Sequence, residues 1–430
     1  MKTTVKDKRY EEVIALPKEK QFQPMKQSMF FRVLLKLASS FDLAATHFKC
    51  NKIGMERLKP DEPCLVLMNH SSFIDLEIVA SVLFPRKFNI VATTDSFMGI
   101  MKWVMRLIGC IPTRKFVTDT KLIRDMLYCV KNLKSSVVMY PEASYSFDGT
   151  ATPLPDSIGR CIKMLGVPVV VIRTYGAFAR QPLYNCLRKR KVQVSADIKY
   201  VLSADEVAVK GADDINEIIN KEFDFDNFAW QQENQISISD AERAEGLNRV
   251  LYKCPHCMTE GKLLGKGTML ICEECGKEYE LTEYGYLEAK DGDTKFDHVP
   301  DWYQWERECV RKDILDGTYE LNVPVDICML VDMKCIYRVG EGVLSHDREG
   351  FRLTGCDGKL NYSQKATTSY SLYADYYWYE IGDVICIGDN NVSYYCFPKA
   401  GGDIVAKTRL ATEEMYKMEK EARRTKFKIR

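Results

Sequence analysis

Residues 64–75, with the sequence CLVLMNHSSFID, join a short apolar run to a polar turn and set the fold of the first half of the chain. The run 64–68 has the length and composition of a buried strand. His70 and Asp75 would point about 140° apart on one continuous helix, so their side chains can meet only if His70 precedes the helix. We therefore expect a strand, a turn that carries His70, and a helix whose first turn carries Asp75.

The same alternation continues along the chain. Further apolar runs that read as strands lie at 89–92, 136–140 and 167–172. Stretches with a helical pattern lie at 72–84, 97–108, 118–134 and 157–165, and the acidic segment 203–245 also reads as helical. Strands that alternate with helices predict an α/β fold with a largely parallel sheet covered by helices on both faces.

The 430 residues predict two to four domains. We expect a polar N-terminal segment over 1–24, an α/β domain over 25–245, a small cysteine-rich domain over 250–290 and a β-rich domain over 295–430. Residues 27–48 are apolar but interrupted by three charges, which predicts an amphipathic helix that lies on the core or on a membrane surface. No apolar run reaches the roughly 18 residues that suggest a membrane span.

The pair His70 and Asp75 suits proton transfer. A histidine at the carboxyl end of a strand lies where open α/β sheets bind their ligands, and a carboxylate at a helix start fixes its tautomer and raises its basicity. The alternative is structural, because Ser72 and Asp75 have the spacing of a capping box, with His70 as a polar turn residue. One carboxylate can do both.

Four motifs resemble those of the glycerolipid (lysophospholipid) acyltransferase family, in the family's order. They are Asn69-His70-x4-Asp75, Gly109-Cys-Ile-Pro-Thr-Arg-Lys115, Tyr140-Pro-Glu-Ala-Ser-Tyr-Ser146 and Gly166-Val-Pro-Val-Val170. The resemblance covers roughly residues 25–240. The third motif departs from the family pattern aromatic-Pro-Glu-Gly-Thr-Arg at Ala143, Ser144 and Tyr145, and the missing Arg leaves the identity of the acceptor open.

The resemblance implies transfer of a fatty acyl group from acyl-CoA or acyl-carrier protein to a hydroxyl of a lysophospholipid such as 1-acylglycerol-3-phosphate, in phospholipid synthesis or remodelling. It implies that His70 is the general base and that Asp75 stabilises the imidazolium. It also implies that the acceptor is bound by four residues: Arg114, Lys115, Glu142 and Ser144. No serine or cysteine nucleophile is needed, so no acyl-enzyme is expected.

Two Cys-x-x-Cys turns, at Cys254/Cys257 and Cys272/Cys275, are separated by 14 residues. Each turn can direct two thiolates at one ion, and two turns complete a tetrahedral Zn²⁺ site with no open position. We therefore expect a structural zinc ribbon, with His256 exposed rather than bound to the metal. The competing reading, a redox dithiol, is disfavoured because two matched pairs occur.

The C-terminal region is different in composition. Residues 318–400 are rich in Tyr, Val, Ile and Gly with regular turn signals, which predicts antiparallel strands, and 403–424 reads as a helix. The order of elements is compatible with a pleckstrin-homology-like domain. The aromatic cluster over 373–379 suits core and cross-strand packing better than a ligand surface.

The net charge of +1 conceals a strong asymmetry. Residues 1–200 hold 32 basic and 17 acidic residues, a balance of +15, and the remainder holds 29 basic and 43 acidic ones. A basic half suits an anionic substrate and anionic lipids, although a solvated surface is the alternative.

With the N-terminus lacking an apolar signal and 16 cysteines mostly scattered singly, we expect a cytoplasmic protein, peripheral at the inner face of a membrane. The other hypothesis is a non-enzymatic zinc-ribbon adaptor for nucleic acid or protein, with nucleic acid disfavoured because the ribbon segment is acidic.

Overall fold

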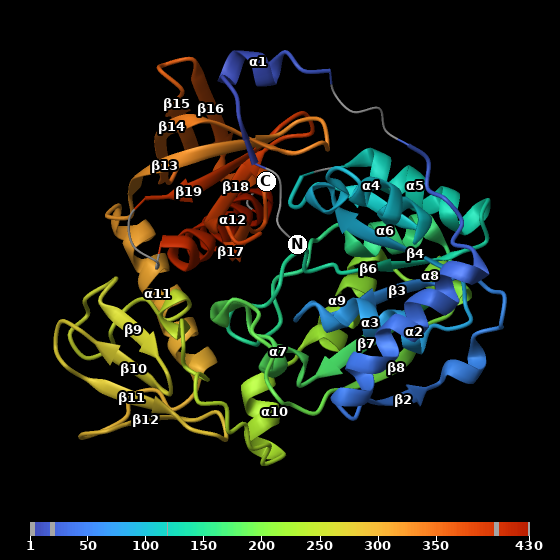
Figure 1. The fold of residues 1–430 in the computed structure, drawn as a ribbon, viewed down its shortest axis with the longest axis horizontal. Coiled ribbons are helices and arrows are strands. Elements are labelled where there is room, and N and C mark those ends of the chain that lie inside the picture. Colours follow the sequence, from blue (N-terminus) through green and yellow to red (C-terminus); the bar gives the residue numbers. More distant parts are fainter. Residues whose placement is uncertain (1–4, 18–21, 118, 400–403, 429–430) are drawn as a thin grey trace. The chain divides into compact units, whose positions relative to one another are not determined.

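The computed structural model describes residues 5–17, 22–117, 119–399 and 404–428 (Figure 1). The chain forms two compact units. We call residues 20–182 and 187–230 the α/β unit, and residues 1–19, 183–186 and 231–430 the C-terminal unit. Two predicted helices, 118–134 and 403–424, begin at residues that lie outside the described ones, namely 118 and 403.

A seven-stranded sheet forms the centre of the α/β unit, with strand order β2-β8-β7-β3-β6-β4-β5. Its strands are β2 (Lys49–Ile53), β3 (Leu65–Met68), β4 (Phe88–Thr93), β5 (Cys110–Thr113), β6 (Ser136–Met139), β7 (Val169–Tyr175) and β8 (Ser195–Leu202). Strands β3 to β7 run parallel to one another, whereas β8 pairs antiparallel with β7. The predicted α/β class and mainly parallel sheet are therefore confirmed, and the carboxyl ends of five strands meet at one edge.

Both faces of this sheet are covered. Leu65 and Leu67 of β3 join a core with helices α5, α6 and α9, while the alternate residues Val66 and Met68 are also fully buried. Because neighbouring residues of a strand point to opposite faces, burial of both sets requires cover on each side. The helices are α2 (Met29–Ala45), α3 (Ile74–Val82), α4 (Met101–Leu107), α5 (Thr120–Lys131), α6 (Ile158–Leu165), α7 (Ala177–Arg180), α8 (Ala204–Val209), α9 (Ala212–Phe223) and α10 (Asn227–Glu233).

The sequence interpretation missed three strands and extended one helical segment too far. Strands β2 and β5 are the edges of the sheet, and β5 contains Pro112, which is tolerated at an edge because it removes only a donor that faces outward. Strand β8 alternates half-buried and buried residues and carries charges on its open face. The helical prediction for 203–245 is right as far as Glu233, although three separate helices cover this segment. Residues 234–235 and 241–245 form turns on either side of an irregular stretch, in which Ile238 donates its N–H to the carbonyl of Glu283.

The C-terminal unit contains two antiparallel sheets. The smaller has the order β12-β11-β10-β9, and the larger has the order β16-β15-β14-β13-β19-β18-β17, with β1 (Val5–Asp7) added parallel to β14. The small sheet comprises β9 (Leu263–Lys266), β10 (Met269–Cys272), β11 (Glu278–Leu281) and β12 (Leu287–Ala289). The large sheet comprises β13 (Leu321–Leu330), β14 (Ile336–Asp347), β15 (Gly350–Gly355), β16 (Leu360–Lys365), β17 (Tyr373–Trp378), β18 (Gly382–Gly388) and β19 (Ser393–Pro398). The predicted antiparallel strands are confirmed; the likeness to a pleckstrin-homology domain stays a prediction.

This unit also contains two long helices, α11 (Val299–Asp316) and α12 (Ile404–Lys428), and the short helix α1 (Tyr10–Ile14). Helix α11 was not predicted, although Pro300 in its first turn is a typical start signal. The aromatic cluster over 373–379 is largely core, because Tyr373, Tyr376 and Trp378 are buried. Throughout the described segments, none of the helices combines the length and the apolar character needed to cross a membrane.

Candidate functional site

His70 and Asp75 meet at the carboxyl end of β3. His70 lies in the turn after the strand, Asp75 in the first turn of α3, and Nδ1 of His70 is 2.9 Å from Oδ2 of Asp75. The Asp75 side chain is 1% exposed and that of His70 18%. The expected strand–turn–helix arrangement is therefore present, with the carboxylate on the imidazole.

Asp75 also supports the helix start. Its Oδ2 accepts the backbone N–H groups of Ser71 at 2.8 Å and of Ser72 at 3.1 Å. These donors at the beginning of a helix stabilise a negative charge. The carboxylate half of the predicted capping box is therefore present together with the contact to the imidazole. The other half is absent, because the N-cap residue is Phe73 and the buried hydroxyl of Ser72 has no hydrogen-bond partner among the described residues.

The turn after β6 is hydrogen-bonded to the backbone of His70. One oxygen of Glu142 accepts the backbone N–H of His70 at 2.8 Å, and the other accepts that of Thr152 at 2.8 Å. Ser146 donates its N–H to the carbonyl of His70 at 3.1 Å. Glu142 is buried and therefore fixes the backbone on which the imidazole is mounted; its contact with an acceptor stays a prediction.

Two aromatic rings lie against the imidazole. The ring centroid of Tyr140 is 4.1 Å from that of His70 at an interplanar angle of 23°, and that of Tyr145 is 4.2 Å away at 36°. The sequence interpretation missed these contacts, and took Tyr145 only as the loss of an Arg. The third motif contains both tyrosines, but nothing in the sequence predicts the reversal at Ala143 that brings Tyr145 back to the imidazole.

Burial lowers the pKa of His70 below its usual value, against the hydrogen bond to Asp75, which raises it; the positive charge of Lys115 acts in the same direction as burial. The imidazole is therefore held neutral near pH 7, as a general base requires. In the part of the chain that the structure describes, no protein group bonds to its Nε2. Nε2, the atom that would take a proton, therefore has no partner among the described residues.

The predicted acceptor-binding residues lie on the same sheet edge. Arg114 and Lys115 directly follow β5 and are half-buried, and Glu142 and Ser144 follow β6. The hydroxyl of Ser144 is buried and has no hydrogen-bond partner among the described residues. Asn69 ties the turn to β7, since its Oδ1 accepts the N–H of Thr174 at 2.9 Å.

Ala143, which stands where the family pattern has a glycine, adopts a backbone conformation that is unusual for an alanine. Ala143 has a φ of +58° and donates its N–H to the carbonyl of Tyr140 at 3.1 Å. The left-handed conformation costs an L-residue roughly 1–2 kcal/mol, a cost that glycine does not have. The turn therefore keeps a conformation typical of glycine without the glycine.

The four cysteines of the two Cys-x-x-Cys turns come together in the C-terminal unit. Their sulfur atoms all lie within 4.8 Å of one another, with 3.8 Å between Cys254 and Cys275 and 3.7 Å between Cys257 and Cys272. Tetrahedral thiolate ligands at a Zn–S distance of about 2.3 Å have sulfur atoms about 3.8 Å apart. The cluster could therefore hold a metal ion, and His256 is exposed and outside it.

The comparisons with known proteins match the segment that contains His70 and Asp75. Residues 49–174, which contain all four motifs, match the family model described as Acyltransferase. The chain is 30% identical over 152 residues to a chloroplastic 1-acyl-sn-glycerol-3-phosphate acyltransferase of Brassica napus, covering 34% of this chain and 43% of that protein. It is 26% identical over 171 residues to a 1-acyl-sn-glycerol-3-phosphate acyltransferase of Chlamydomonas reinhardtii, covering 38% of this chain and 50% of that one.

The chain thus spans about half the length of the curated relatives it matches. Among solved structures, the 1-acyl-sn-glycerophosphate (LPA) acyltransferase PlsC from Thermotoga maritima is similar with a TM-score of 0.39 and 14% identity, over 45% of this chain and 77% of that one. The resemblance expected from the four motifs is confirmed for an acyltransferase domain within the α/β unit. The family model ends at residue 174, before the four-cysteine cluster and the large C-terminal sheet begin.

Proposed function

We propose that this protein is an O-acyltransferase of the 1-acylglycerol-3-phosphate type. It moves a fatty acyl group from a thioester donor, acyl-CoA or acyl-carrier protein, to a hydroxyl of a lysophospholipid. The observation that carries the proposal is the 2.9 Å contact between His70 and Asp75 at the carboxyl edge of a sheet that matches an acyltransferase domain.

In the proposed reaction, Nε2 of His70 accepts the proton of the acceptor hydroxyl as its oxygen attacks the thioester carbonyl. The new C–O bond forms, the C–S bond breaks, and the thiolate leaves with the proton from the imidazolium. Asp75 stabilises the imidazolium through Nδ1. General-base help of this kind contributes about 10²–10⁴ in rate. The acyl group passes directly between the substrates, without a covalent enzyme intermediate.

The acceptor's polar head would be held by Arg114, Lys115 and Ser144, while Glu142 supports the turn. The proposal for Lys115 draws on its electrostatic effect on His70, and that for Ser144 on its buried, unpartnered hydroxyl. Two basic groups beside a base suit a phosphate whose neighbouring hydroxyl is to be acylated.

The test is release of free thiol by the purified chain with each donor and a panel of acceptors: lysophosphatidic acid, lysophosphatidylcholine and glycerol 3-phosphate. We expect wild-type release with at least one acceptor, and losses of at least about 10²-fold in His70→Ala and Asp75→Asn. Lys131→Met, on an exposed residue of α5, is the control and should match wild type. Release no faster than in His70→Ala with every donor and acceptor would end the proposal.

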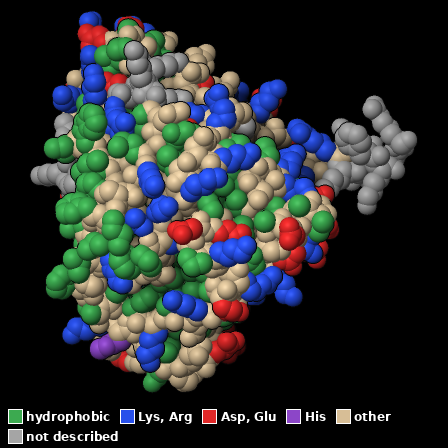
Figure 2. Space-filling model, turned by 90° about the vertical axis from the view of Figure 1, so that its right-hand side faces the viewer, with side chains coloured by type: hydrophobic (Ala, Val, Ile, Leu, Met, Phe, Trp, Pro, Cys, Tyr) green, Lys and Arg blue, Asp and Glu red, His purple; other side chains and the backbone are tan. Residues whose placement is uncertain are grey.

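The proposed partner of the α/β unit is an anionic lipid surface. Helix α2 exposes a row of large apolar side chains, led by Phe41 at 81% and Phe30 at 69%, and α4 exposes Trp103 at 61%. Arg32 and Lys36 lie on α2, and α4 has two further basic residues. Figure 2, seen from the side on which α2 lies in Figure 1, shows hydrophobic side chains gathered along an edge beside Lys and Arg. Apolar groups for the acyl boundary beside cations for the headgroups suit the anionic cytoplasmic leaflet.

Sedimentation with vesicles tests this surface. The double variant Phe30→Ser/Phe41→Ser should lose binding to phosphatidylserine vesicles at least tenfold, because two exposed aromatic anchors are removed. Val209→Ser, at an 82% exposed position on α8, is the matched control and should bind as wild type does. Equal binding by the double variant would contradict docking through α2.

The four-cysteine cluster is proposed to hold a structural Zn²⁺. The proposal draws on the sulfur spacing and on four protein ligands, which leave no open position for catalysis. A bound ion would link the two turns and fix the ribbon formed by β9 and β10; no step of acyl transfer uses it.

A further inference from the structure

The imidazole of His70 is held by one segment of chain, residues 140–146. Strand β6 ends at Met139, the chain reverses at Ala143 through the left-handed conformation described above, and Tyr145 thereby returns to the same imidazole that Tyr140 contacts. This segment therefore fixes His70 through both its backbone and its ring.

Tyr145 has a support of its own. Its ring meets that of Phe73 edge to face, with centroids 6.0 Å apart at an angle of 83°. Aromatic pairs in this geometry stabilise by about 0.5–1.5 kcal/mol beyond the area they bury. Phe73 lies in the turn between His70 and α3 and is 62% exposed, so Tyr145 contacts both the imidazole and a solvent-exposed ring.

The charges that face His70 come from several elements. Asp75 of α3 bonds to Nδ1, Lys115 after β5 supplies a positive charge, and Glu142 binds the backbone N–H of the residue. Tyr140 adds no charge at neutral pH, because burial raises its pKa well above its usual value. Both tyrosines contact the imidazole through their rings.

We propose that Tyr145, together with Tyr140, is a positioning residue that fixes the plane of the His70 ring against Asp75 and shields the ring from water, so that Nε2 alone faces the acceptor. The idea rests on the proposed function and deepens it, because it assigns a role to a side chain that touches the base. The aromatic ring, and not the phenol hydroxyl, performs this role.

Two variants separate the ring from the hydroxyl. Tyr145→Phe keeps the stacked ring, and Tyr145→Ala removes it. In thiol release, we expect Tyr145→Ala to lower kcat about 10- to 100-fold, the range expected for a misaligned base, with KM for the acceptor changed less than threefold. Loss of shielding should also raise the pKa of His70 and move the acidic limb of the kcat/KM profile to higher pH. Tyr145→Phe should keep the wild-type kcat and profile.

A second readout needs no turnover. The chain has only five histidines, so the titration of His70 can be followed by NMR and assigned with His70→Ala. We expect a pKa of His70 below that of free histidine in wild type and in Tyr145→Phe, and a higher one in Tyr145→Ala.

Several outcomes would overturn the proposal. They are an unchanged His70 titration in Tyr145→Ala, an equal shift in Tyr145→Phe, and a change confined to KM, which would make Tyr145 an acceptor contact. A wild-type chain that is inactive with every acceptor would end the proposed function, whereas the NMR titration would still decide whether Tyr145 controls His70.

Discussion

Asp75 illustrates how much one residue does at this site. Its Oδ2 contacts the imidazole of His70 and accepts two backbone N–H groups, so the same carboxylate supports the start of α3 and orients the imidazole. The sequence predicted the meeting of His70 with Asp75 because only one local geometry permits it. The contact of Tyr145 with His70 could not be predicted, because it depends on a reversal at Ala143, a residue that rarely adopts positive φ.

At the residue scale, we predict that Lys115→Met both weakens binding of the acceptor and raises the pKa of His70. Loss of a charge-assisted contact should raise KM for lysophosphatidic acid about tenfold. Since the charge of Lys115 lowers the pKa of His70, its removal should move the acidic limb of the rate profile to higher pH. The measurement is the pH dependence of thiol release, with Lys131→Met as the control. An unchanged KM would exclude Lys115 from the acceptor site.

Helices and strands could be predicted where their hydrophobic pattern was strong, and they were missed where that pattern was weak. Strands β3, β4, β6 and β7 are continuous apolar runs because both faces of the sheet are buried. The edge strands β2 and β5 need no such run, since they are only partly covered. Helix α11 escaped prediction because its inward face is partly polar and meets α12 through ion pairs.

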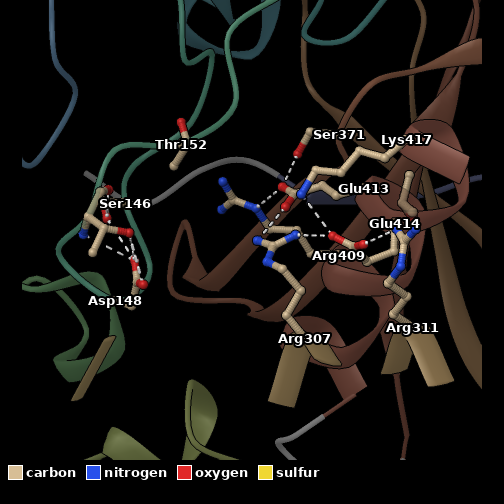
Figure 3. A network of polar contacts seen from close by, with 12 residues as sticks. Ser146, Asp148, Thr152, Arg307, Arg311, Ser371, Arg409, Glu413, Glu414 and Lys417 are labelled. Carbon is tan, nitrogen blue, oxygen red and sulfur yellow. Dashed lines mark hydrogen bonds and ion pairs between the residues drawn. The ribbon is translucent and has the colours of Figure 1, made fainter. Parts of the chain in front are cut away.

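These ion pairs form a network between α11 and α12 (Figure 3). Glu413, which is 1% exposed, pairs with Arg307 at 2.7 Å and with Arg409 at 3.2 Å, and accepts the hydroxyl of Ser371 at 2.6 Å. Glu414 receives Arg307 and Arg311, each at 3.0 Å. The buried charges are thus paired, and the two helices depend on each other.

At the element scale, we predict that Glu413→Gln destabilises the C-terminal unit by about 3–5 kcal/mol, because it removes the buried carboxylate charge that the guanidinium groups of Arg307 and Arg409 share. Glu421→Gln removes a 62% exposed partner of Arg311 and should cost less than about 1 kcal/mol. Urea unfolding measures both. A Glu413→Gln variant as stable as Glu421→Gln would show that the network contributes little.

The same residue sets a pH dependence. The surrounding cations lower the pKa of Glu413 to about 2 despite its burial. A carboxyl with a depressed pKa contributes stability that is fully present above its unfolded value near 4.5 and is lost as the pH falls through about 2. Wild type should therefore lose stability between pH 4.5 and 2 more steeply than Glu413→Gln.

For the whole molecule, the charge asymmetry of the sequence has a structural counterpart. The basic first 200 residues form most of the α/β unit, which contains the His70–Asp75 pair and the exposed apolar side chains of α2 and α4. The acidic remainder forms most of the C-terminal unit. The four-cysteine cluster is built into the latter, because Trp302 of α11 donates to the carbonyl of Lys253 at 3.0 Å and packs on Tyr279. Removal of a metal ion would therefore disturb more than the ribbon itself.

At this scale, we predict one zinc ion per chain and loss of that ion in Cys272→Ser, measured by elemental analysis of purified protein. Chelation should lower the Tm of the C-terminal unit by several degrees, since binding energy at such a site is folding energy. Cys309→Ser changes a half-buried cysteine outside the cluster and should keep the ion. Zinc retained by Cys272→Ser, or absent from wild type, would contradict the assignment.

The central claim is direct acyl transfer with His70 as the base, and mass spectrometry of a single reaction tests it most directly. Purified chain, acyl-CoA and lysophosphatidic acid are mixed, and the lipid product and the intact protein are weighed in the same sample. We predict that the acceptor gains one acyl group, that the mass of the protein stays unchanged, and that His70→Ala yields at least about 10²-fold less product. An acyl adduct on the wild-type chain that is consumed as product forms, or equal product from His70→Ala, would contradict the account.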